Sequence, residues 1–226
     1  MNWQDEGYLL SKRKFRENAN IVNIFTINQG KVSGIVFGGN SRKIRNYLQI
    51  GNKIFVVNNS KNENKIGYLK TELIEAISPK YFSDKKRTTA ILAISSILNA
   101  LLPESQSNKT IYKSLENFYN NLELDNWIVL YIFWELNLIK ELGFGFDLKK
   151  FKNDKFNDDD ILRINLDHQD YEIPYFFVTK KIPASLSPKI IRQSLSFTRL
   201  IFQNKFFLPN SIIFPKTRVL LESYFT

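Results

Sequence analysis

Two runs of basic residues near the N-terminus are the side chains in this sequence best suited to binding chemistry. The first run is Lys12, Arg13, Lys14 and Arg16, and the second is Arg42, Lys43 and Arg45. Lysine and arginine hold phosphate groups by charge and hydrogen bonding, and no covalent bond changes. The second run follows Gly38 and Gly39, which let a backbone approach a ligand closely. Both runs are predicted phosphate-binding sites, and the alternative for each is a solvated strand or loop.

Aromatic residues lie within or close to both runs. Flat rings can stack on exposed nucleic-acid bases. The candidate stacking rings are Tyr8, Phe15, Phe37 and Tyr47. For each ring the alternative is a place in the hydrophobic core, which is the more common location for an aromatic residue in a small barrel.

Residues that could catalyse a reaction are sparse. Asp158, Asp159 and Asp160 are adjacent. Their side chains would alternate in direction, so a solvated acidic loop is favoured over a metal site. His168 is the only histidine; a surface position is favoured, because a catalytic triad needs partners that only the fold can place. No GxxxxGK[ST] motif is present. The sequence therefore predicts a binding protein and not an enzyme.

Both runs lie within the first 78 residues, which have the pattern of short β-strands. The predicted strands are Gly7–Lys14, Ile21–Ile27, Lys31–Phe37, Lys53–Val57 and Gly67–Ser78. Asn28-Gln29-Gly30 is a predicted hairpin turn. Five short strands in this length suit a small barrel, either an OB-fold or an SH3-like barrel. Because side chains alternate along a strand, Lys12 and Lys14 should share one face and Arg13 should lie on the other.

After Pro79 the pattern changes to helices. The predicted helices are an apolar-striped helix from about Ile91 to Pro103, Thr110–Leu122, Asp125–Gly143, Ser187–Asn204 and a short one from Pro215 to Phe225. Asp125 is expected to cap its helix, Gly143 to end it, and Ser187 to cap the next. Residues 147–186 show only a weak pattern. We therefore expect an α+β protein with a barrel over residues 1–79 and an all-helical domain over residues 80–226, in which 147–186 is irregular.

The charge of the chain is unevenly distributed. The 226 residues have a net charge of +10, and residues 1–80 alone hold 13 Lys/Arg against 6 Asp/Glu, a net of +7. A basic excess favours a polyanionic partner, either nucleic acid or a membrane surface. Genomic bias toward lysine is the alternative, but it should spread the charge evenly. The asymmetry therefore favours a nucleic-acid-binding N-terminal module.

Several classes of protein are excluded by composition. The chain contains no cysteine, which rules out a disulfide framework, a thiolate zinc site and a cysteine nucleophile. The N-terminus is acidic and lacks the apolar run of a signal peptide. No apolar stretch approaches the roughly 18 residues that a membrane span needs. We expect a cytoplasmic protein.

An ordered series of short motifs resembles the bacterial DNA repair protein RecO family. The segments that carry it are Trp3–Leu10, Gly38–Arg45, Leu101-Leu102-Pro103-Glu104, Glu135-Leu136 and Glu141–Leu148. The third resembles the family's "LLPE" helix end, and the last two resemble its "FEL…ELGFGLDL" signature. The resemblance is clear over residues 3–150 and loose over 185–225. No single motif is specific, but their order along a strand-then-helix pattern is.

The resemblance implies an OB-fold that binds single- and double-stranded DNA and anneals complementary strands. It also implies a protein that contacts RecR and the acidic tail of single-stranded-DNA-binding protein, helps to load RecA, and associates with the nucleoid. The predicted tail-binding residues on the helical surface are Lys109, Lys113, Arg192 and Arg199. Many relatives carry zinc-binding cysteines after the "GFGLDL" segment, where this chain has Phe151, so neither zinc nor another cofactor is expected. An OB-fold RNA-binding protein and a metal-dependent nuclease remain the alternatives.

Overall fold

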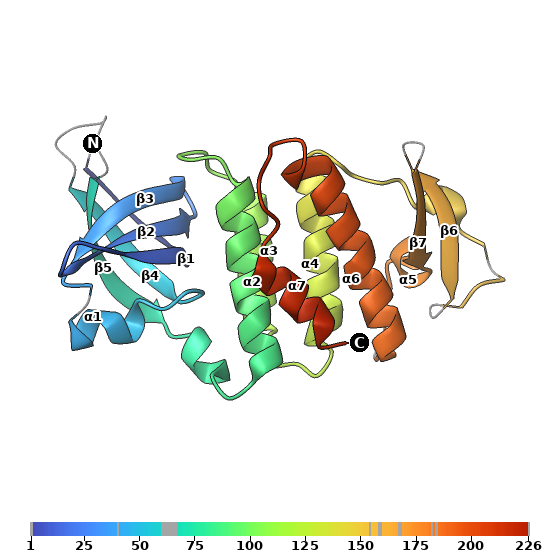
Figure 1. The fold of residues 1–226 in the computed structure, drawn as a ribbon, viewed down its shortest axis with the longest axis horizontal. Helices are drawn as coiled ribbons and strands as arrows, with labels where there is room; N and C mark the ends of the chain where they lie inside the picture. Colours follow the sequence, from blue (N-terminus) through green and yellow to red (C-terminus); the bar gives the residue numbers. More distant parts are fainter. Residues whose placement is uncertain are drawn as a thin grey trace. The chain divides into compact units, whose positions relative to one another are not determined.

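The computed structural model describes residues 2–39, 41–59, 67–153, 155–157, 160–166, 169–181, 183 and 185–225. The described elements, labelled in Figure 1, belong to two compact units. The first is Met1–Tyr112 with Pro215–Arg218, and the second is Lys113–Phe214 with Val219–Thr226. Strands and helices both contribute, as the expected α+β class requires.

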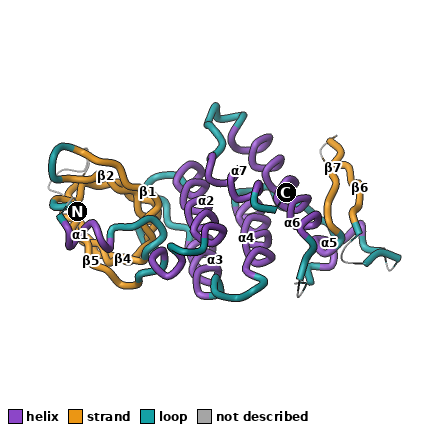
Figure 2. Tube along the Cα trace, turned by 60° about the horizontal axis from the view of Figure 1, so that its bottom comes forward, coloured by secondary structure: helices purple, strands orange, loops and turns teal. Residues whose placement is uncertain are grey.

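A closed five-stranded barrel forms the N-terminal part of the first unit. Its strands are β1 (Asn2–Phe15), β2 (Ala19–Thr26), β3 (Gly30–Phe37), β4 (Lys53–Asn59) and β5 (Gly67–Glu75). They pair in the order β1-β2-β3-β5-β4, and β4 returns to pair with β1; Figure 2 shows the strands wrapped into a ring. The β3–β5 pair is parallel and the other pairs are antiparallel. All five predicted strands are confirmed, the first being longer than predicted at both ends.

Aliphatic side chains from all five strands fill the barrel. The buried cluster consists of Leu9, Val22, Ile24, Val32, Val36, Leu48, Ile54, Val56 and Leu69. Burying each aliphatic side chain stabilises the fold by about 1.5–3 kcal/mol. Gly34 has a specific role here, because a Cβ at this position would lie 2.3 Å from Cγ of Leu69. The absence of a side chain at Gly34 therefore allows β3 and β5 to come together.

The second basic run lies on a short helix, α1 (Arg42–Tyr47), which the sequence analysis did not predict. Ser41 caps this helix by accepting a hydrogen bond from the Ile44 amide. Ile44 and Tyr47 pack against the barrel core, and the Tyr47 hydroxyl donates to the Thr71 carbonyl at 2.6 Å. Its 6 residues are too few for a helical period to show in the sequence, so packing against the barrel stabilises α1.

The barrel is followed by the 3₁₀ turn η1 (Ser78–Tyr81) and by α2 (Lys85–Leu101), which belong to the same compact unit. Asn99 of α2 accepts hydrogen bonds from Asn23 Nδ2 at 2.6 Å and, through its carbonyl, from Lys31 Nζ at 3.0 Å. Packing in this unit continues to Tyr112. The division into a barrel domain over residues 1–79 and a helical domain over residues 80–226 stays a prediction.

The second unit is built around helices. α3 (Lys109–Asn120) and α7 (Lys216–Ser223) each contribute residues to both units. The unit's own elements are α4 (Trp127–Glu141), η2 (Lys149–Phe151), α5 (Phe176–Thr179), α6 (Pro188–Phe202) and the π-helical turn η3 (Gln203–Phe207). In Figure 1, α4 and α6 run side by side. No helix among the described residues is long and apolar enough to span a membrane.

The expectation of an all-helical C-terminal part was wrong. Strands β6 (Ile161–Leu166) and β7 (Gln169–Pro174) form an antiparallel hairpin within the segment expected to be irregular. Each strand has six residues, and their buried positions, such as Ile164 and Tyr171, are interrupted by charged ones. An alternation this short gave no clear strand signal, and the hairpin is stabilised by packing against α6.

The predicted helix ends were mostly confirmed. Gly143 has φ +97°, and the amides of Gly143 and Phe144 donate to the carbonyls of Lys140 and Ile139, both at 3.0 Å. This is the Schellman arrangement of a helix C-terminus. Ser187 caps α6 as expected. The prediction for Asp125 was wrong: Asn126 is the N-cap residue of α4, and its side chain makes no capping hydrogen bond.

Candidate nucleic-acid interface

The two predicted basic runs meet at one end of the barrel. The first run lies at the end of β1 and in the turn to β2, and the second follows the end of β3. These two connections are joined by a hydrogen bond from the Gly38 amide to the Asn18 carbonyl at 2.8 Å. Residues about 30 positions apart in the sequence thus contribute to one surface.

The cations of α1 point into solvent. Arg42, Lys43 and Arg45 are exposed, whereas Ile44 and Tyr47 of the same helix pack against the barrel. The helix itself contains no acidic residue. Within the described part of the chain, no carboxylate forms an ion pair with these three side chains. Their charge is therefore available to an external anion.

Lys12 connects the two runs. Its ammonium group is half-buried and donates a hydrogen bond to the carbonyl of Leu48, the C-cap residue of α1, at 2.6 Å. Burial lowers the pKa of Lys12, and the positive charge of Arg45 lowers it further. A phosphate placed between these side chains would relieve the repulsion between them.

The remaining residues of the first run point in different directions, as strand alternation predicted. Lys12 pairs with the core residue Val22, whereas Arg13 pairs with Ile21 on the outer face. Arg13 and Lys14 are exposed. Arg16 has φ 55° in the turn, and its guanidinium lies 5.2 Å from the centroid of the Phe15 ring. The run therefore provides cations both at the barrel end and on the outer surface.

The four candidate stacking rings differ in how accessible they are to solvent. Tyr8 is only 2% exposed and packs against Tyr112 with ring centroids 5.4 Å apart. Tyr47 is anchored through its hydroxyl and packs on the barrel core. Phe15 is half-buried and Phe37 is 55% exposed. Two of the four rings therefore have packing roles, and Phe37 is the most accessible of them.

Sequence reasoning missed a fifth ring, Tyr68. It is 51% exposed and stacks on Phe37, with ring centroids 4.8 Å apart and an interplanar angle of 26°. Tyr68 stands immediately after Gly67 at the start of a predicted strand. The sequence contained no signal that it faces outward, because the face depends on the register of β5 against β3.

The predicted partner-binding residues are not gathered at one pocket. Lys109 and Lys113 are exposed on α3, and Arg192 is exposed on α6. Arg199 is half-buried and forms an ion pair with Glu222 at 3.0 Å. None of the four lines a pocket identified in the described part of the second unit.

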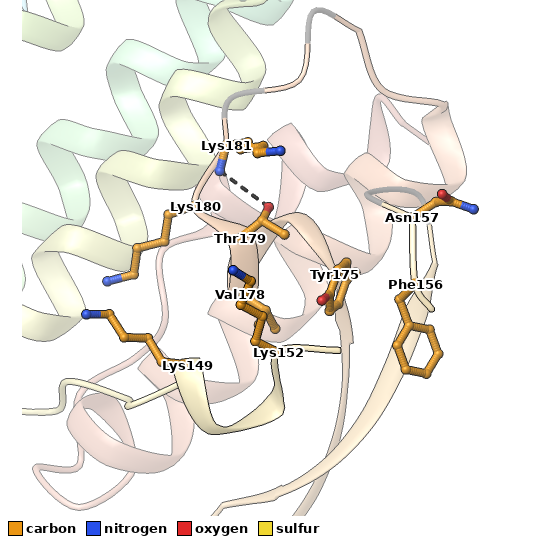
Figure 3. Close-up of a pocket in the computed structure, with 9 residues that line it drawn as sticks. All are labelled: Lys149, Lys152, Phe156, Asn157, Tyr175, Val178, Thr179, Lys180 and Lys181. Atoms are coloured by element: carbon orange, nitrogen blue, oxygen red, sulfur yellow. Dashed lines mark hydrogen bonds between the residues drawn. The ribbon is translucent and has the colours of Figure 1, made fainter. Parts of the chain in front are cut away.

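Two neighbouring pockets in the second unit share the residue Lys180. The apolar one has a volume of about 220 Å³ and is lined by Phe133, Leu136, Asn137, Lys140, Phe146, Leu148, Phe177 and Lys180. The other, of about 600 Å³, is shown in Figure 3; the described residues that line it include four lysines and no acidic residue: Lys149, Lys152, Lys180 and Lys181. In this view Lys149 and Lys180 extend toward the same side. An acidic ligand with an apolar end would match this pair of pockets.

Candidate groups for metal chemistry fall partly outside the described residues. Asp158, Asp159 and His168 lie outside them. Asp160 is described, and its carboxylate accepts a hydrogen bond from the Asn157 amide at 2.7 Å. The described residues contain no group of three side chains suited to hold a metal ion.

Comparison with known proteins agrees with this architecture. A family model described as "Recombination protein O N terminal" matches residues 1–77, and one described as "Recombination protein O C terminal" matches residues 83–159. Proteins named DNA repair protein RecO from Ehrlichia chaffeensis and from Wolbachia pipientis wMel are 36% and 34% identical to the chain over 152 residues. A third, from Caulobacter vibrioides, is 33% identical over 151 residues.

The matched part is 66% of this chain and spans 62% of the length of each of these relatives. The two family models follow one another along the chain, the first over the barrel and the second from α2 to beyond α4. The sequence motifs and both models agree: the chain belongs to the RecO family.

Proposed function

We propose that this protein acts in DNA repair and recombination as a mediator that binds DNA, anneals complementary single strands and catalyses no covalent reaction. The observation that carries this proposal is the meeting of the two basic runs at one end of the barrel, with Lys12 beside Arg45. The names of the relatives support a role in DNA repair. Such a protein would act in the cytoplasm, on DNA in the nucleoid.

We propose further that the barrel is an OB-fold. The strand order β1-β2-β3-β5-β4, closed by β4 pairing with β1, and the helix between β3 and β4 support this assignment over an SH3-like barrel. OB-folds bind oligonucleotides on the outer face of their strands and at adjacent loops. The basic end of this barrel is therefore well placed for such binding.

Annealing places a simple physical demand on this surface. Two polyanionic strands must be brought together while their base edges stay accessible to each other. Lysine and arginine side chains neutralise the backbones without reading the sequence, so binding should be tolerant of sequence and steeply dependent on salt. The exposed cations of α1 and β1 meet this demand.

The helical unit is the proposed site for partner proteins, namely RecR and single-stranded-DNA-binding protein, with RecA loading as the outcome. An acidic tail that ends in an aromatic residue would place its ring in the apolar pocket beside Phe177 and its carboxylates near Lys140 and Lys180. The lysine-lined pocket of Figure 3 would extend this contact. Lys109, Lys113, Arg192 and Arg199 remain further candidate residues for binding the tail.

Strand annealing is the test of the proposed function. Complementary labelled oligonucleotides are mixed with the protein, with and without single-stranded-DNA-binding protein, and duplex formation is followed in time. We expect the protein to accelerate annealing at low salt and to lose this effect as salt is raised. Annealing at the uncatalysed rate, together with no binding to either oligonucleotide, would exclude the proposal.

Two further experiments test the alternative functions. Labelled single strands incubated with Mg²⁺ or Mn²⁺ should remain intact, whereas cleavage products would indicate a nuclease. Unlabelled DNA should compete for binding at least as well as RNA of the same length. A clear preference for RNA would favour an RNA-binding role.

A further inference from the structure

Two aromatic rings lie exposed and stacked on the outer surface of the barrel. Phe37 and Tyr68 are 55% and 51% exposed, and their ring centroids are 4.8 Å apart. Exposing two large rings to water is unfavourable, and contiguous exposed apolar groups commonly mark a binding surface. The rings come from β3 and β5, the one parallel pair of the barrel.

The strand register shows which face the rings occupy. Tyr68 pairs with Ile35, which is only 8% exposed, and its chain neighbour Leu69 lies in the barrel core. Phe37 follows Val36, another core residue. Because neighbours on a strand alternate, both rings point away from the core. They therefore lie on an outward surface held by the barrel backbone.

Two cross-strand rows connect the ring pair to cations on the outer face of the barrel. One row runs Arg13–Ile21–Ile35–Tyr68 and the other runs Phe15–Ala19–Phe37. Arg13 ends the first row, and Arg16 lies over the Phe15 ring at the end of the second. Lys70 is exposed two residues after Tyr68, on the same side of β5. Neither row contains an acidic residue, and the one carboxylate that β5 places on the same side, Glu72, lies two residues beyond Lys70 and four beyond Tyr68. The surface next to the rings therefore combines flat rings with positive charge.

We propose that Phe37 and Tyr68 form a platform on which an unpaired base of a single strand stacks, while the neighbouring cations bind the phosphates on either side. This inference rests on the proposed function and adds to it a preference for single strands. Phosphate contacts alone hold single and double strands alike, but a stacking ring needs a free base face, which a duplex covers. Because the two rings already pack on each other, little side-chain freedom would be lost on binding.

The competing explanation for the pair is structural. Stacked rings on neighbouring strands stabilise a sheet, and among the described residues β3 and β5 pair at Gly34–Gly67 and Ile35–Tyr68. A purely structural pair would affect folding stability and would not distinguish single strands from duplexes. The experiment must therefore measure both properties.

The test uses Phe37→Leu, Tyr68→Leu and the double variant, because leucine keeps apolar packing but removes the flat ring. Affinity is measured by fluorescence anisotropy at low salt for a labelled single strand and for a duplex of equal length. Stacking is followed by the quenching of 2-aminopurine in the single strand. Phe82→Leu is the matched control, because Phe82 is 64% exposed in the same unit but lies outside the barrel.

We expect each variant to bind the single strand about tenfold more weakly. Duplex affinity and the slope of affinity against salt should be unchanged, since the phosphate contacts remain. Tyr68→Phe should behave as the unaltered protein, because it keeps the ring. Quenching of 2-aminopurine should fall in the double variant and persist in Phe82→Leu.

Two results would overturn the platform. One is a folded double variant that binds and quenches the single strand as the unaltered protein does. The other is an equal loss of affinity for both strand forms together with a lowered melting temperature, which would assign the pair a structural role. Both differ from failure of the proposed function, in which the unaltered protein itself would bind no DNA.

Discussion

The side chain of Lys12 connects the two basic runs, which are far apart in the sequence. Its ammonium group donates a hydrogen bond to the carbonyl of Leu48, the C-cap residue of α1, and lies near Arg45. Burial lowers the pKa of Lys12, and the positive charge of Arg45 lowers it further. In the unfolded chain Lys12 would keep its proton to higher pH than in the folded protein. The free energy of unfolding should therefore rise with pH between the folded-state and the unfolded-state pKa of Lys12. Phosphate binding has the opposite preference, because it needs the charged form.

DNA binding should depend on pH through the charge of Lys12. As pH rises through the lowered pKa of Lys12, its charge is lost and DNA affinity should fall before ordinary lysines deprotonate. Lys12→Arg keeps a positive charge at all accessible pH values, so its affinity should hold to higher pH. Dissociation constants measured across alkaline pH check this, and parallel profiles for the two proteins would contradict it.

The exposed cations of α1 should contribute to DNA affinity and to its dependence on salt. Changing Arg42, Lys43 and Arg45 together to alanine should weaken binding to single and double strands. It should also reduce the slope of log affinity against log salt by up to about 2.7 for duplex DNA. Filter binding over a salt series measures both quantities.

The matched control for this variant removes three exposed lysines of the same unit that lie outside the barrel: Lys80, Lys85 and Lys86. Its affinity should change little. An unchanged slope in the α1 variant would eliminate this cluster from the interface.

At the scale of the element, α2 depends on its N-cap. Asp84 accepts a hydrogen bond from the Arg87 amide at 3.0 Å and pairs with the Arg87 guanidinium at 2.6 Å. Burial raises the pKa of this carboxyl, but these hydrogen bonds and the charge of Arg87 outweigh that effect and leave the pKa lowered. A lowered pKa means that its stabilising effect is complete above the unfolded-state pKa and is lost as pH falls through the folded-state value.

Asp84→Ala should therefore lower the free energy of unfolding by about 1 kcal/mol at neutral pH. Asp84→Asn should cost less, because asparagine caps helices but forms no ion pair. Urea unfolding at neutral and acidic pH measures both values. The difference between Asp84→Asn and the unaltered protein should shrink in acid, and a difference that stays constant with pH would argue against the ion pair.

The end of α4 offers a test of backbone conformation alone. A Cβ at Gly143 would meet no atom within 4 Å, so only the φ of +97° opposes a side chain there. Gly143→Ala should cost about 1–2 kcal/mol of unfolding free energy. Gly145→Ala is the control, because Gly145 lies in the same connection without a positive φ, and a Cβ there would lie 3.3 Å from Cγ of Lys140, a flexible side chain that can shift. Equal costs for the two variants would show that φ at Gly143 is not the cause.

At the scale of the whole molecule, the proposed DNA surface and the pockets proposed for an acidic tail belong to different compact units. Lys140→Gln combined with Lys180→Asn should weaken binding of an acidic, aromatic-ended peptide by about fivefold or more. Asparagine suits position 180 because Lys180 has φ 56°. DNA affinity should be unchanged. Fluorescence anisotropy with labelled peptide and labelled DNA measures both.

The control for this prediction removes equal charge from the other candidate surface, through Lys113→Gln and Arg192→Gln. These variants should bind the peptide normally. Loss of peptide binding in the control alone would assign the tail to the surfaces of α3 and α6. Loss of DNA binding in the Lys140 and Lys180 variant would show that the two functions are not separable.

The sequence by itself determined the features that depend on neighbouring residues. Strand patterns located the five barrel strands, Ser187-Pro188 marked the start of α6, and Gly143 marked the end of α4. The basic runs were visible as charge, and the order of short motifs identified the family. These signals are local, because propensity, capping and turn formation involve residues only a few positions apart.

Only the tertiary structure decided which distant residues meet. The hydrogen bond from Gly38 to Asn18 brings the two basic runs together, and the β3–β5 register places Tyr68 against Phe37. The same holds for the helix α1 and the β6–β7 hairpin, which are too short to show a period and are held by packing. Strand register and packing join residues that are far apart in sequence, and a pattern along a single chain does not encode them locally.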